Sequence, residues 1–462
     1  MSAVSLPFFA LLAATVALIA TVPGAWRRWV LLIASALFYF GVDPVSAGLG
    51  LAVVAVNFAF LRALLAESVE LRRDRLYFAS IGFNVAAFVV LKLTLEAASE
   101  ATAWRIAGWP LGYPLGFSFM ILMLHAALSD AYTELHTPRG RPGTFALYAL
   151  FFPYLTSGPV ERLGQMEERL DRPRRPALED LRAGIALIAL GLVKKLVVAN
   201  RIGPYVDAVF AAPQPQSATT LVLAIALNAA HVYCDFSGYT DIARGAARCL
   251  GIEVRINFAR PFVARSVTEF WRRWHISFST WLRDYLYMPL AYALRRATPA
   301  APFLAIVPTF LVAGFWHRAT WTFCLFGLAH GVAMALEMRF GRPLGRFAPG
   351  PRRAAATLAA RLYTLVFLGL SIVLFSASSI GEAGAIVVRL AADPLLPWPR
   401  ELFGYLGPFL FLLMAGAILA WQVLERWHER LTPACTPAFV AVAALLVLFL
   451  GLEGPGFIYE QF

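Results

Sequence analysis

The stretch LVAGFWHRATWTFCLFGLAHGVAMALE, residues Leu311–Glu337, is apolar enough to lie in lipid, yet it contains two histidines. His317 stands at a break between two apolar runs, and His330 lies deep within the second run. An ionisable side chain in the middle of a membrane span costs several kcal/mol, so by default it faces a cavity and has a function. The alternative is a histidine hydrogen-bonded between two packed helices. The stretch therefore predicts membrane-embedded helices around a polar site.

The composition of the whole chain agrees with a membrane protein. Its 462 residues are 60% hydrophobic and only 15% charged, and the mean hydropathy is +0.67. Apolar runs of about 17 to 22 residues, each long enough to cross a bilayer as a helix, recur from end to end. These features predict an all-α polytopic membrane protein of about 11 to 13 transmembrane or re-entrant helices. The predicted helices are 6–22, 29–42, 47–65, 77–95, 111–131, 144–157, 181–199, 217–235, 303–316, 319–337, 362–378, 403–422 and 436–452.

The first apolar run and the cysteines argue against a cleaved signal peptide and against a disulfide framework or metal site. The run Leu6–Val22 has no basic residue before it and is followed by Arg27 and Arg28, which reverses the charge layout of a signal peptide, so we interpret it as a retained helix. The four cysteines lie far apart without C-x-x-C spacing. We therefore expect neither a disulfide framework nor a metal site.

The basic residues indicate which loops are cytoplasmic. The loops at 27–28, 72–75 and 139–141 are separated by pairs of spans, so they share one side, and the N-terminus is predicted outside. The loop 158–180 is also basic, although only the short run 144–157 precedes it. A re-entrant helix, which enters and leaves the membrane on the same side, would keep this loop on the cytoplasmic side. Irregular backbone at that depth requires surrounding protein or a cavity.

The formal net charge of +12 has the same explanation, because most Lys and Arg residues lie in short loops. We therefore expect no nucleic-acid partner. The remaining positive charge suits an acidic cytoplasmic partner, such as an acyl carrier protein or coenzyme A.

A second informative stretch is FWRRWHISFSTWLRDYLYMPL, Phe270–Leu290. We interpret it as one helix, with a capping box at Ser266 and Glu269 and a stop at Pro289. At helical spacing its polar stripe holds Arg272, His275, Ser279 and Arg283, beside a stripe of aromatic residues that includes Trp274. The basic residues suit an anionic or phosphate-bearing ligand. A passive helix at headgroup depth remains the alternative for the arginines.

A third cluster, HVYCDFSGYTDIARG at His231–Gly245, places Asp235 and Asp241 where the predicted span 217–235 ends. Asp235 is a candidate to pair with an arginine of the second stretch or to orient a histidine; simple helix termination is the alternative. The chain contains no G-x-S-x-G, Walker or H-E-x-x-H motif. The candidate chemistry is therefore histidine-centred, since a neutral imidazole can take a proton from an acceptor hydroxyl during acyl transfer.

At these residues the sequence resembles the membrane-bound O-acyltransferase family, in particular its bacterial alginate O-acetylases and teichoic-acid D-alanyl transfer proteins. The resemblance covers most of the chain, in the order of that branch. It is carried by PLGFSF (114–119), FFPYLTSGPVER (151–162), GLVKKLVVANRI (191–202), YCDFSGYTDIARG (233–245), the second stretch (270–290) and GFWHRATWTFCLFGLAHG (314–331).

The resemblance implies helices around a central funnel or tunnel and two functional histidines, here His275 and His330, with His330 as the catalytic base. His317 matches a further family histidine, but Arg318 replaces the glycine that usually follows it. His317 and Asp235 are therefore supporting candidates. Arg272, Arg273, Trp274, Ser279 and Arg283 are the candidates for donor binding. One domain over 1–462 is expected, with N-terminal helices in 1–110, a catalytic core in 111–340 and C-terminal helices in 341–462.

The resemblance also implies a function in the bacterial inner membrane. A cytoplasmic thioester, acyl-coenzyme A or acyl carrier protein, would donate an acyl group, with acetyl expected first. The group would leave on the outer side, to a partner acetyltransferase or directly to an exopolysaccharide such as alginate or a cell-wall glycan. Two alternatives stay open: D-alanyl transfer to teichoic acid, and a transporter or polymer-export channel.

Overall fold

The computed structural model describes residues 4–96, 105–106, 109–110, 112–156, 158–211, 213, 216–341, 351–392, 436–452 and 454. In this part of the chain the expected all-α class is confirmed. The described strands are β1 (Arg105–Ile106) and β2 (Trp109–Pro110), which form one short antiparallel pair. The predicted helix 403–422 lies outside the described residues.

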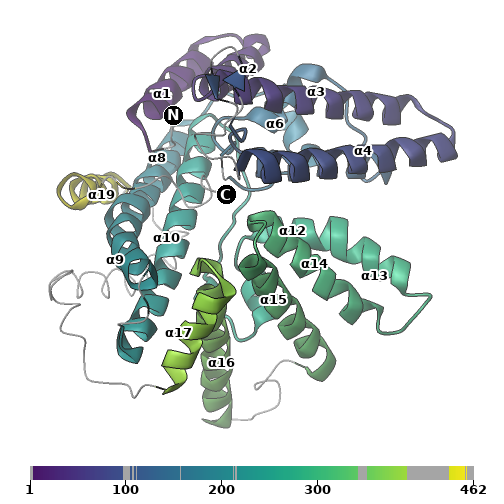
Figure 1. Ribbon diagram of the computed structural model, residues 1–462. Coiled ribbons are helices and arrows are strands. Elements are labelled where there is room, and N and C mark those ends of the chain that lie inside the picture. Colours follow the sequence, from purple (N-terminus) through teal and green to yellow (C-terminus); the bar gives the residue numbers. More distant parts are fainter. Residues whose placement is uncertain are drawn as a thin grey trace.

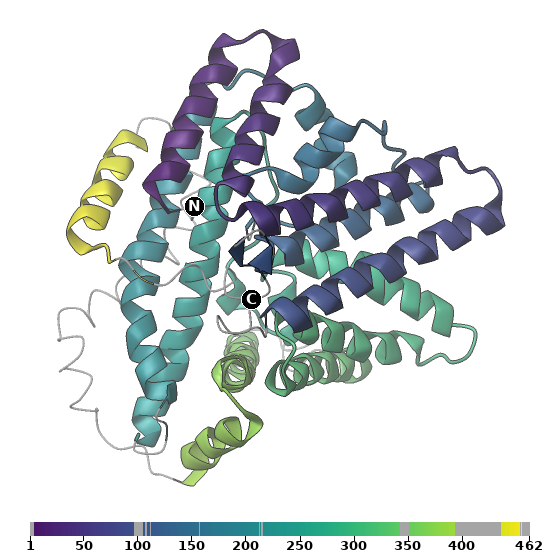
Figure 2. The same cartoon turned by 45° about the horizontal axis from the view of Figure 1, so that its top comes forward.

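The N-terminal region consists of helices joined by short turns. They are α1 (Leu6–Thr21), α2 (Gly24–Phe40), α3 (Pro44–Ala66) and α4 (Glu70–Leu91), which continues as the π-helix η1 (Lys92–Glu96). Asp43 begins α3, because its carboxylate accepts hydrogen bonds from the backbone N–H groups of Val45 and Ser46 at 3.1 and 3.3 Å. In Figures 1 and 2 the hairpin of α3 and α4 extends to one side of the molecule.

A short helix and an irregular buried segment follow α5 (Phe117–Tyr132). Helix α6 (Pro142–Leu150) has only 9 residues, so it is about 14 Å long, less than half of a bilayer core. Residues 151–156 and 158–162 are buried without being helical, and α7 (Leu163–Asp171) comes next. Arg139, before α6, forms an ion pair with Asp171 at 3.2 Å. The segment therefore enters and leaves at the same end, in agreement with the predicted re-entrant helix.

Helix α8 (Leu178–Leu192), the π-helix η2 (Val193–Ala199) and α9 (Asn200–Ala211) are continuous, and α10 (Ala218–Cys249) packs along them. The prediction that this span ends at residue 235 was wrong, because α10 continues for 32 residues. Glycines allow the close packing: a Cβ on Gly191 would lie 2.4 Å from the carbonyl oxygen of Gly238. Helices α9 and α10 lie on the side of the molecule opposite the α3–α4 hairpin (Figure 1).

The second stretch is not the single helix that we predicted. After η3 (Pro261–Val263), its residues fall in α11 (Val267–Trp271), α12 (Ile276–Leu282), the π-helix η4 (Arg283–Tyr287) and α13 (Met288–Leu294). Pro289 lies in the first turn of α13 rather than at a stop, and only the Ser266 half of the capping box forms as expected, at 3.0 Å to the N–H of Glu269. The chain reverses direction between α11 and α12.

The remaining helices complete the bundle. They are α14 (Ala301–His317), α15 (Trp321–Phe340), α16 (Pro351–Ser376), α17 (Ile380–Ala392) and α19 (Thr436–Leu450). A Cβ on Gly327 of α15 would lie 2.2 Å from the carbonyl oxygen of Phe310 on α14, so these two helices are in close contact. Among the described residues, five helices are long and apolar enough to cross a membrane: those at 44–66, 70–94, 218–249, 321–340 and 354–376.

Candidate active site

His275 lies at the tip of a re-entrant hairpin formed by α11 and α12. Its backbone is left-handed, with φ of 43°, and its side chain is fully buried. It packs on Phe119, near the start of α5, whereas Tyr285 on the returning arm donates to Asp130, near the end of α5, at 2.5 Å. The predicted polar stripe around His275 is therefore wrong, because the chain reverses there and encloses the imidazole among phenylalanine rings.

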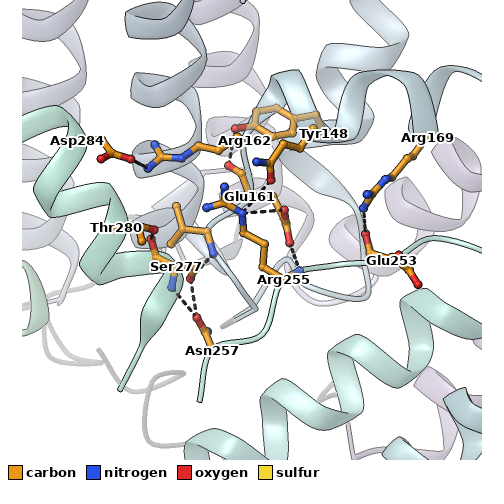
Figure 3. Close-up of polar contacts among 12 residues, drawn as sticks. Tyr148, Glu161, Arg162, Arg169, Glu253, Arg255, Asn257, Ser277, Thr280 and Asp284 are labelled. Carbon is orange, nitrogen blue, oxygen red and sulfur yellow. Dashed lines mark hydrogen bonds and ion pairs between the residues drawn. The ribbon is translucent and has the colours of Figure 1, made fainter. Parts of the chain in front are cut away.

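Hydrogen bonds from two other segments hold this tip. The N–H of Ile276 donates to the carbonyl oxygen of Asn257 at 2.9 Å, and the hydroxyl of Ser277 donates to the Asn257 side chain at 2.6 Å. The N–H of Val160 donates to the Ser277 hydroxyl at 2.9 Å. Figure 3 shows Ser277 beside Asn257. These contacts stabilise a left-handed residue that is otherwise unfavourable. Burial, followed by the nearby His317, lowers the pKa of His275 well below its usual value, so the imidazole is neutral.

A polar cluster fixes the returning arm of the hairpin, as Figure 3 shows. The guanidinium of Arg162 lies 4.1 Å from the ring centre of Tyr285 and 3.3 Å from the carboxylate of Asp284. The neighbouring Glu161 accepts a hydrogen bond from the backbone N–H of Arg255 at 2.6 Å. Burial raises the pKa of Glu161 to about 7, against the opposing effect of Arg255. Residues 158–162 thus support the hairpin formed by α11 and α12.

Below the tip lies a cavity of about 70 Å³, which we call the histidine cavity. Its lining includes Trp271, Trp274, His317, Phe326, His330, Ser371 and Phe375. His330 is 1% exposed, so the predicted placement of a buried histidine beside a cavity agrees with the structure. The break at His317 also forms as expected, at the end of α14. Arg318 takes an extended backbone with φ of −154°, which does not require the glycine of the family pattern.

One hydrogen bond defines the protonation of His330. The indole N–H of Trp271 donates to its Nδ1 at 3.1 Å. Because an indole N–H can only donate, Nδ1 must be the unprotonated nitrogen, and a neutral ring carries its proton on Nε2. Nε2 is buried and has no hydrogen-bond partner among the residues that the structure describes. In this state His330 is a hydrogen-bond donor, whereas a base would need a lone pair at Nε2.

A buried carboxylate holds Trp271 in place. Glu337, near the end of α15, accepts hydrogen bonds from the backbone N–H groups of Val267 and Thr268 at 2.7 and 2.9 Å, and from the Thr268 hydroxyl at 2.6 Å. It therefore caps the N-terminus of α11. Glu337 was not among the predicted site residues, although a carboxylate at the end of the apolar run 319–337 was a signal.

Most of the predicted donor-binding residues do not reach the cavity. Arg272 and Arg283 are exposed, and Arg273 pairs with Glu269 at 2.9 Å. The Ser279 hydroxyl donates to the carbonyl oxygen of Trp274 at 3.1 Å. Of the five residues only Trp274 lines the histidine cavity. The prediction assumed a continuous helix, and the reversal at His275 separates these side chains.

The carboxylates of Asp235 and Asp241 on α10 both pair with lysines, and Asp241 also lies 3.7 Å from Arg244 of the same helix. Lys195 lies 2.5 Å from Asp235, and Lys194 lies 2.7 Å from Asp241. Asp235 thus has Lys195 as an ion-pair partner, and its suggested roles beside an arginine or a histidine stay predictions. Each lysine–aspartate pair stabilises a charge in the interior, where an unpaired carboxylate would be costly.

Lys92 is a further buried cation, and it was not among the predicted site residues. It is 1% exposed, and its ammonium donates to the carbonyl oxygen of His317 at 3.2 Å. The ammonium is also 5.9 Å from the ring centre of Tyr113. A lysine inside the predicted span 77–95 was the available signal. Lys92 holds the C-terminal end of α14, where helix carbonyl groups lack backbone partners.

The fold and the site define a polytopic membrane protein with a buried histidine cavity beneath a re-entrant hairpin. The model of the membrane-bound O-acyltransferase family matches residues 105–379. The chain belongs to this family, and the matched segment contains all the histidines of the site.

Three relatives illustrate the range of named activities. A probable alginate O-acetylase from Azotobacter vinelandii is 38% identical over 193 residues, which cover 42% of this chain and 38% of the relative. A peptidoglycan O-acetyltransferase from Helicobacter pylori is 31% identical over 241 residues, 52% and 45% of the two chains. A teichoic acid D-alanyltransferase from Streptococcus thermophilus is 32% identical over 207 residues, 42% and 50%. The matches span half or less of each relative.

Proposed function

We propose that this protein transfers an acetyl group from a cytoplasmic thioester, across the membrane, to a hydroxyl group of an exopolysaccharide or cell-wall glycan. The observation that carries the proposal is the Nε2–H of His330, buried beside an apolar cavity that His317 also lines. Family membership and the named O-acetyltransferase relatives support the same reaction class. The protein would lie in the bacterial inner membrane with its N-terminus outside and its basic loops in the cytoplasm.

In the proposed reaction the acceptor oxygen attacks the thioester carbonyl carbon, the C–S bond breaks, and the acceptor proton ends on the departing sulfur. The Nε2–H of His330 donates to the carbonyl oxygen as negative charge develops there. We assign the transfer of the acceptor proton to His317, which lines the same cavity. His275 does not line the cavity; the ring centre of Phe278 is 4.9 Å from His275 and 5.6 Å from His317, so we assign His275 a positioning role for His317.

The lining of the histidine cavity favours acetyl over D-alanyl. A D-alanyl group carries an ammonium, which needs a carboxylate or several hydrogen-bond acceptors when it is buried. None of the described lining residues is acidic, and most are aromatic or aliphatic. The volume of about 70 Å³ corresponds to about two water molecules, which suits a two-carbon unit. The same small, apolar lining disfavours an export channel for a polymer.

The donor and the acceptor partner belong to the same proposal. Coenzyme A or an acidic acyl carrier protein would deliver the thioester to the basic side of the membrane. A separate acetyltransferase on the outer side would pass the group on, or the polysaccharide would receive it directly.

The test uses the full chain reconstituted in lipid vesicles with acetyl-coenzyme A or an acetylated carrier protein as competing donors. We expect His330→Ala to lower ester formation by about a hundredfold or more, through loss of the oxyanion donor. His330→Gln, whose amide can still donate, should retain about tenfold more activity than His330→Ala. His136→Ala, at a histidine that does not line the cavity, is the matched control. Equal activity of wild type and His330→Ala would exclude the proposed role, and equal loss in both His330 variants would exclude the donor role.

A further inference from the structure

A second cavity, of about 260 Å³, lies between the α2–α3 turn and the start of α5. We call it the hydroxyl cavity, because its polar lining consists mainly of hydroxyl groups: Tyr39, Ser46, Tyr113, Ser118 and Thr156, together with the carboxylate of Asp43. No lysine, arginine or histidine is among its described lining residues. The site described above does not use this cavity.

Two of these hydroxyl groups are buried and have no partner in the part of the chain that the structure describes. Tyr39 is 1% exposed and Thr156 is 2% exposed, and neither hydroxyl has a hydrogen-bond partner among the described residues. A buried polar group without a partner costs about 1 to 3 kcal/mol. A bound ligand that supplies hydrogen bonds would remove this cost, so the two groups point to a polar occupant.

Other polar groups of the hydroxyl cavity already form hydrogen bonds within the protein. Ser46 donates to the carboxylate of Asp43 and accepts a hydrogen bond from the N–H of Gly112 at 2.9 Å. The hydroxyl groups of Tyr113 and Ser118 are 2.9 Å apart. These contacts fix the walls of the cavity before any ligand arrives, which limits the ordering cost of binding.

The cavity is close to the histidine site. Phe119 lines it and also packs on His275, with ring centres 6.0 Å apart. Phe119 contacts Trp316 at 5.2 Å, and Trp316 contacts His317 at 4.9 Å. Two aromatic rings, Phe119 and Trp316, therefore lie between the hydroxyl cavity and the histidine cavity along this path.

We propose that the hydroxyl cavity binds one uncharged sugar ring of the acceptor. Its hydroxyl groups match the hydroxyls of a sugar, and the rings of Tyr39, Tyr113 and Phe119 offer apolar faces for the CH groups of the ring. The carboxylate of Asp43, with no cation in the described lining, opposes an anionic unit such as a uronate or a phosphate. This inference rests on the proposed function and adds to it the charge class of the acceptor.

The experiment measures binding of a neutral glucose trimer and of the corresponding uronate trimer by saturation-transfer NMR, with the full chain in lipid nanodiscs. We expect the neutral trimer to bind at least about tenfold more tightly than the uronate trimer. Thr156→Val and Tyr39→Phe should each weaken binding of the neutral trimer by about three- to tenfold, through loss of one hydrogen bond. Tyr292→Phe, at an exposed tyrosine, is the matched control.

Asp43→Asn tests the charge directly, because asparagine can still cap α3. It should tighten binding of the uronate trimer by about tenfold and leave the neutral trimer nearly unchanged. Asp207→Asn, at an exposed aspartate of α9, should change neither affinity.

Equal or tighter binding of the uronate trimer to the wild type, no binding of the neutral trimer, or unchanged affinities in all three cavity variants would each overturn the inference. Monodisperse elution of each variant in size-exclusion chromatography excludes misfolding. Thioester consumption in the same samples distinguishes the two proposals: its absence with intact sugar binding contradicts the proposed function alone, and its presence without sugar binding contradicts this inference alone.

Discussion

The histidine cavity and the hydroxyl cavity are both walled by aromatic side chains, yet their polar groups differ in kind. The first, of about 70 Å³, contains imidazoles among apolar groups, and the second, of about 260 Å³, contains hydroxyl groups and a carboxylate. An apolar surrounding strengthens a single donor such as the Nε2–H of His330. Several hydroxyl groups in a larger space instead recognise shape and hydrogen-bonding pattern. The comparison separates a site suited to chemistry from a site suited to recognition.

The largest effect that we expect comes from disrupting the hydroxyl cavity. Gly116 has φ of 69°, and a Cβ there would lie 1.8 Å from the carbonyl oxygen of Leu155. Gly116→Ala should lower the free energy of unfolding by about 3 kcal/mol, from the left-handed backbone and the collision together. Thermal unfolding of the purified protein measures this. Gly48→Ala, where a Cβ would meet no atom within 4 Å, is the control, and equal melting temperatures for both variants would contradict the prediction.

The next effect concerns the histidine cavity alone. Trp271→Phe keeps a ring against Phe310 but removes the indole N–H that fixes the protonation of His330. We expect ester formation to fall by about ten- to a hundredfold, because the proton is no longer held on Nε2. Selective 15N labelling of histidine should show a mixture of ring protonation states. Trp26→Phe, at an exposed tryptophan, is the control; an unchanged His330 spectrum would exclude the proposed cause.

A smaller effect is expected from the support beneath the histidine cavity. Glu337→Gln replaces a carboxylate that accepts three hydrogen bonds with an amide that has one acceptor oxygen. The free energy of unfolding should fall by about 2 kcal/mol, since donors of α11 lose their partner. Chemical or thermal unfolding, with Glu70→Gln at an exposed position as the control, checks this. If the two variants unfold alike, the capping role assigned to Glu337 is wrong.

The smallest effect depends on pH and lies outside both cavities. Burial raises the pKa of Glu161 to about 7 from its usual 4.5, so the fold favours the neutral carboxyl. This contribution is complete below the unfolded pKa and is lost as the pH rises through about 7. Between about pH 6 and pH 8 the wild type should lose about 1 kcal/mol of stability that Glu161→Gln does not lose.

The measurement is the melting temperature across this range, with the exposed Glu168→Gln as the control. Parallel pH profiles of the wild type and Glu161→Gln would show that another group titrates.

The sequence predicted those features that follow from local pattern and membrane cost. His317 at a break, His330 inside a span and the short re-entrant run after residue 144 all follow from hydropathy and the parity of basic loops. The reversal at His275 could not be predicted in this way, because WRRWH contains neither glycine nor proline. Its left-handed backbone depends on Asn257 and Val160, which are distant in sequence. The predicted end of the helix at residue 235 was wrong for a similar reason, because a lysine of another helix neutralises the Asp235 carboxylate.

The cap on α11 has a consequence for biosynthesis. Glu337 lies 70 residues after Val267, and its carboxylate accepts a hydrogen bond from the N–H of Val267. A chain made from its N-terminus therefore exposes the re-entrant hairpin before the ribosome has produced the helix that secures it. Val160 and Asn257 precede the hairpin and can receive its tip at once, whereas its base must wait for α15. We expect the hairpin to insert in two stages, tip first and base last, so that the histidine site closes only when α15 has entered the bilayer.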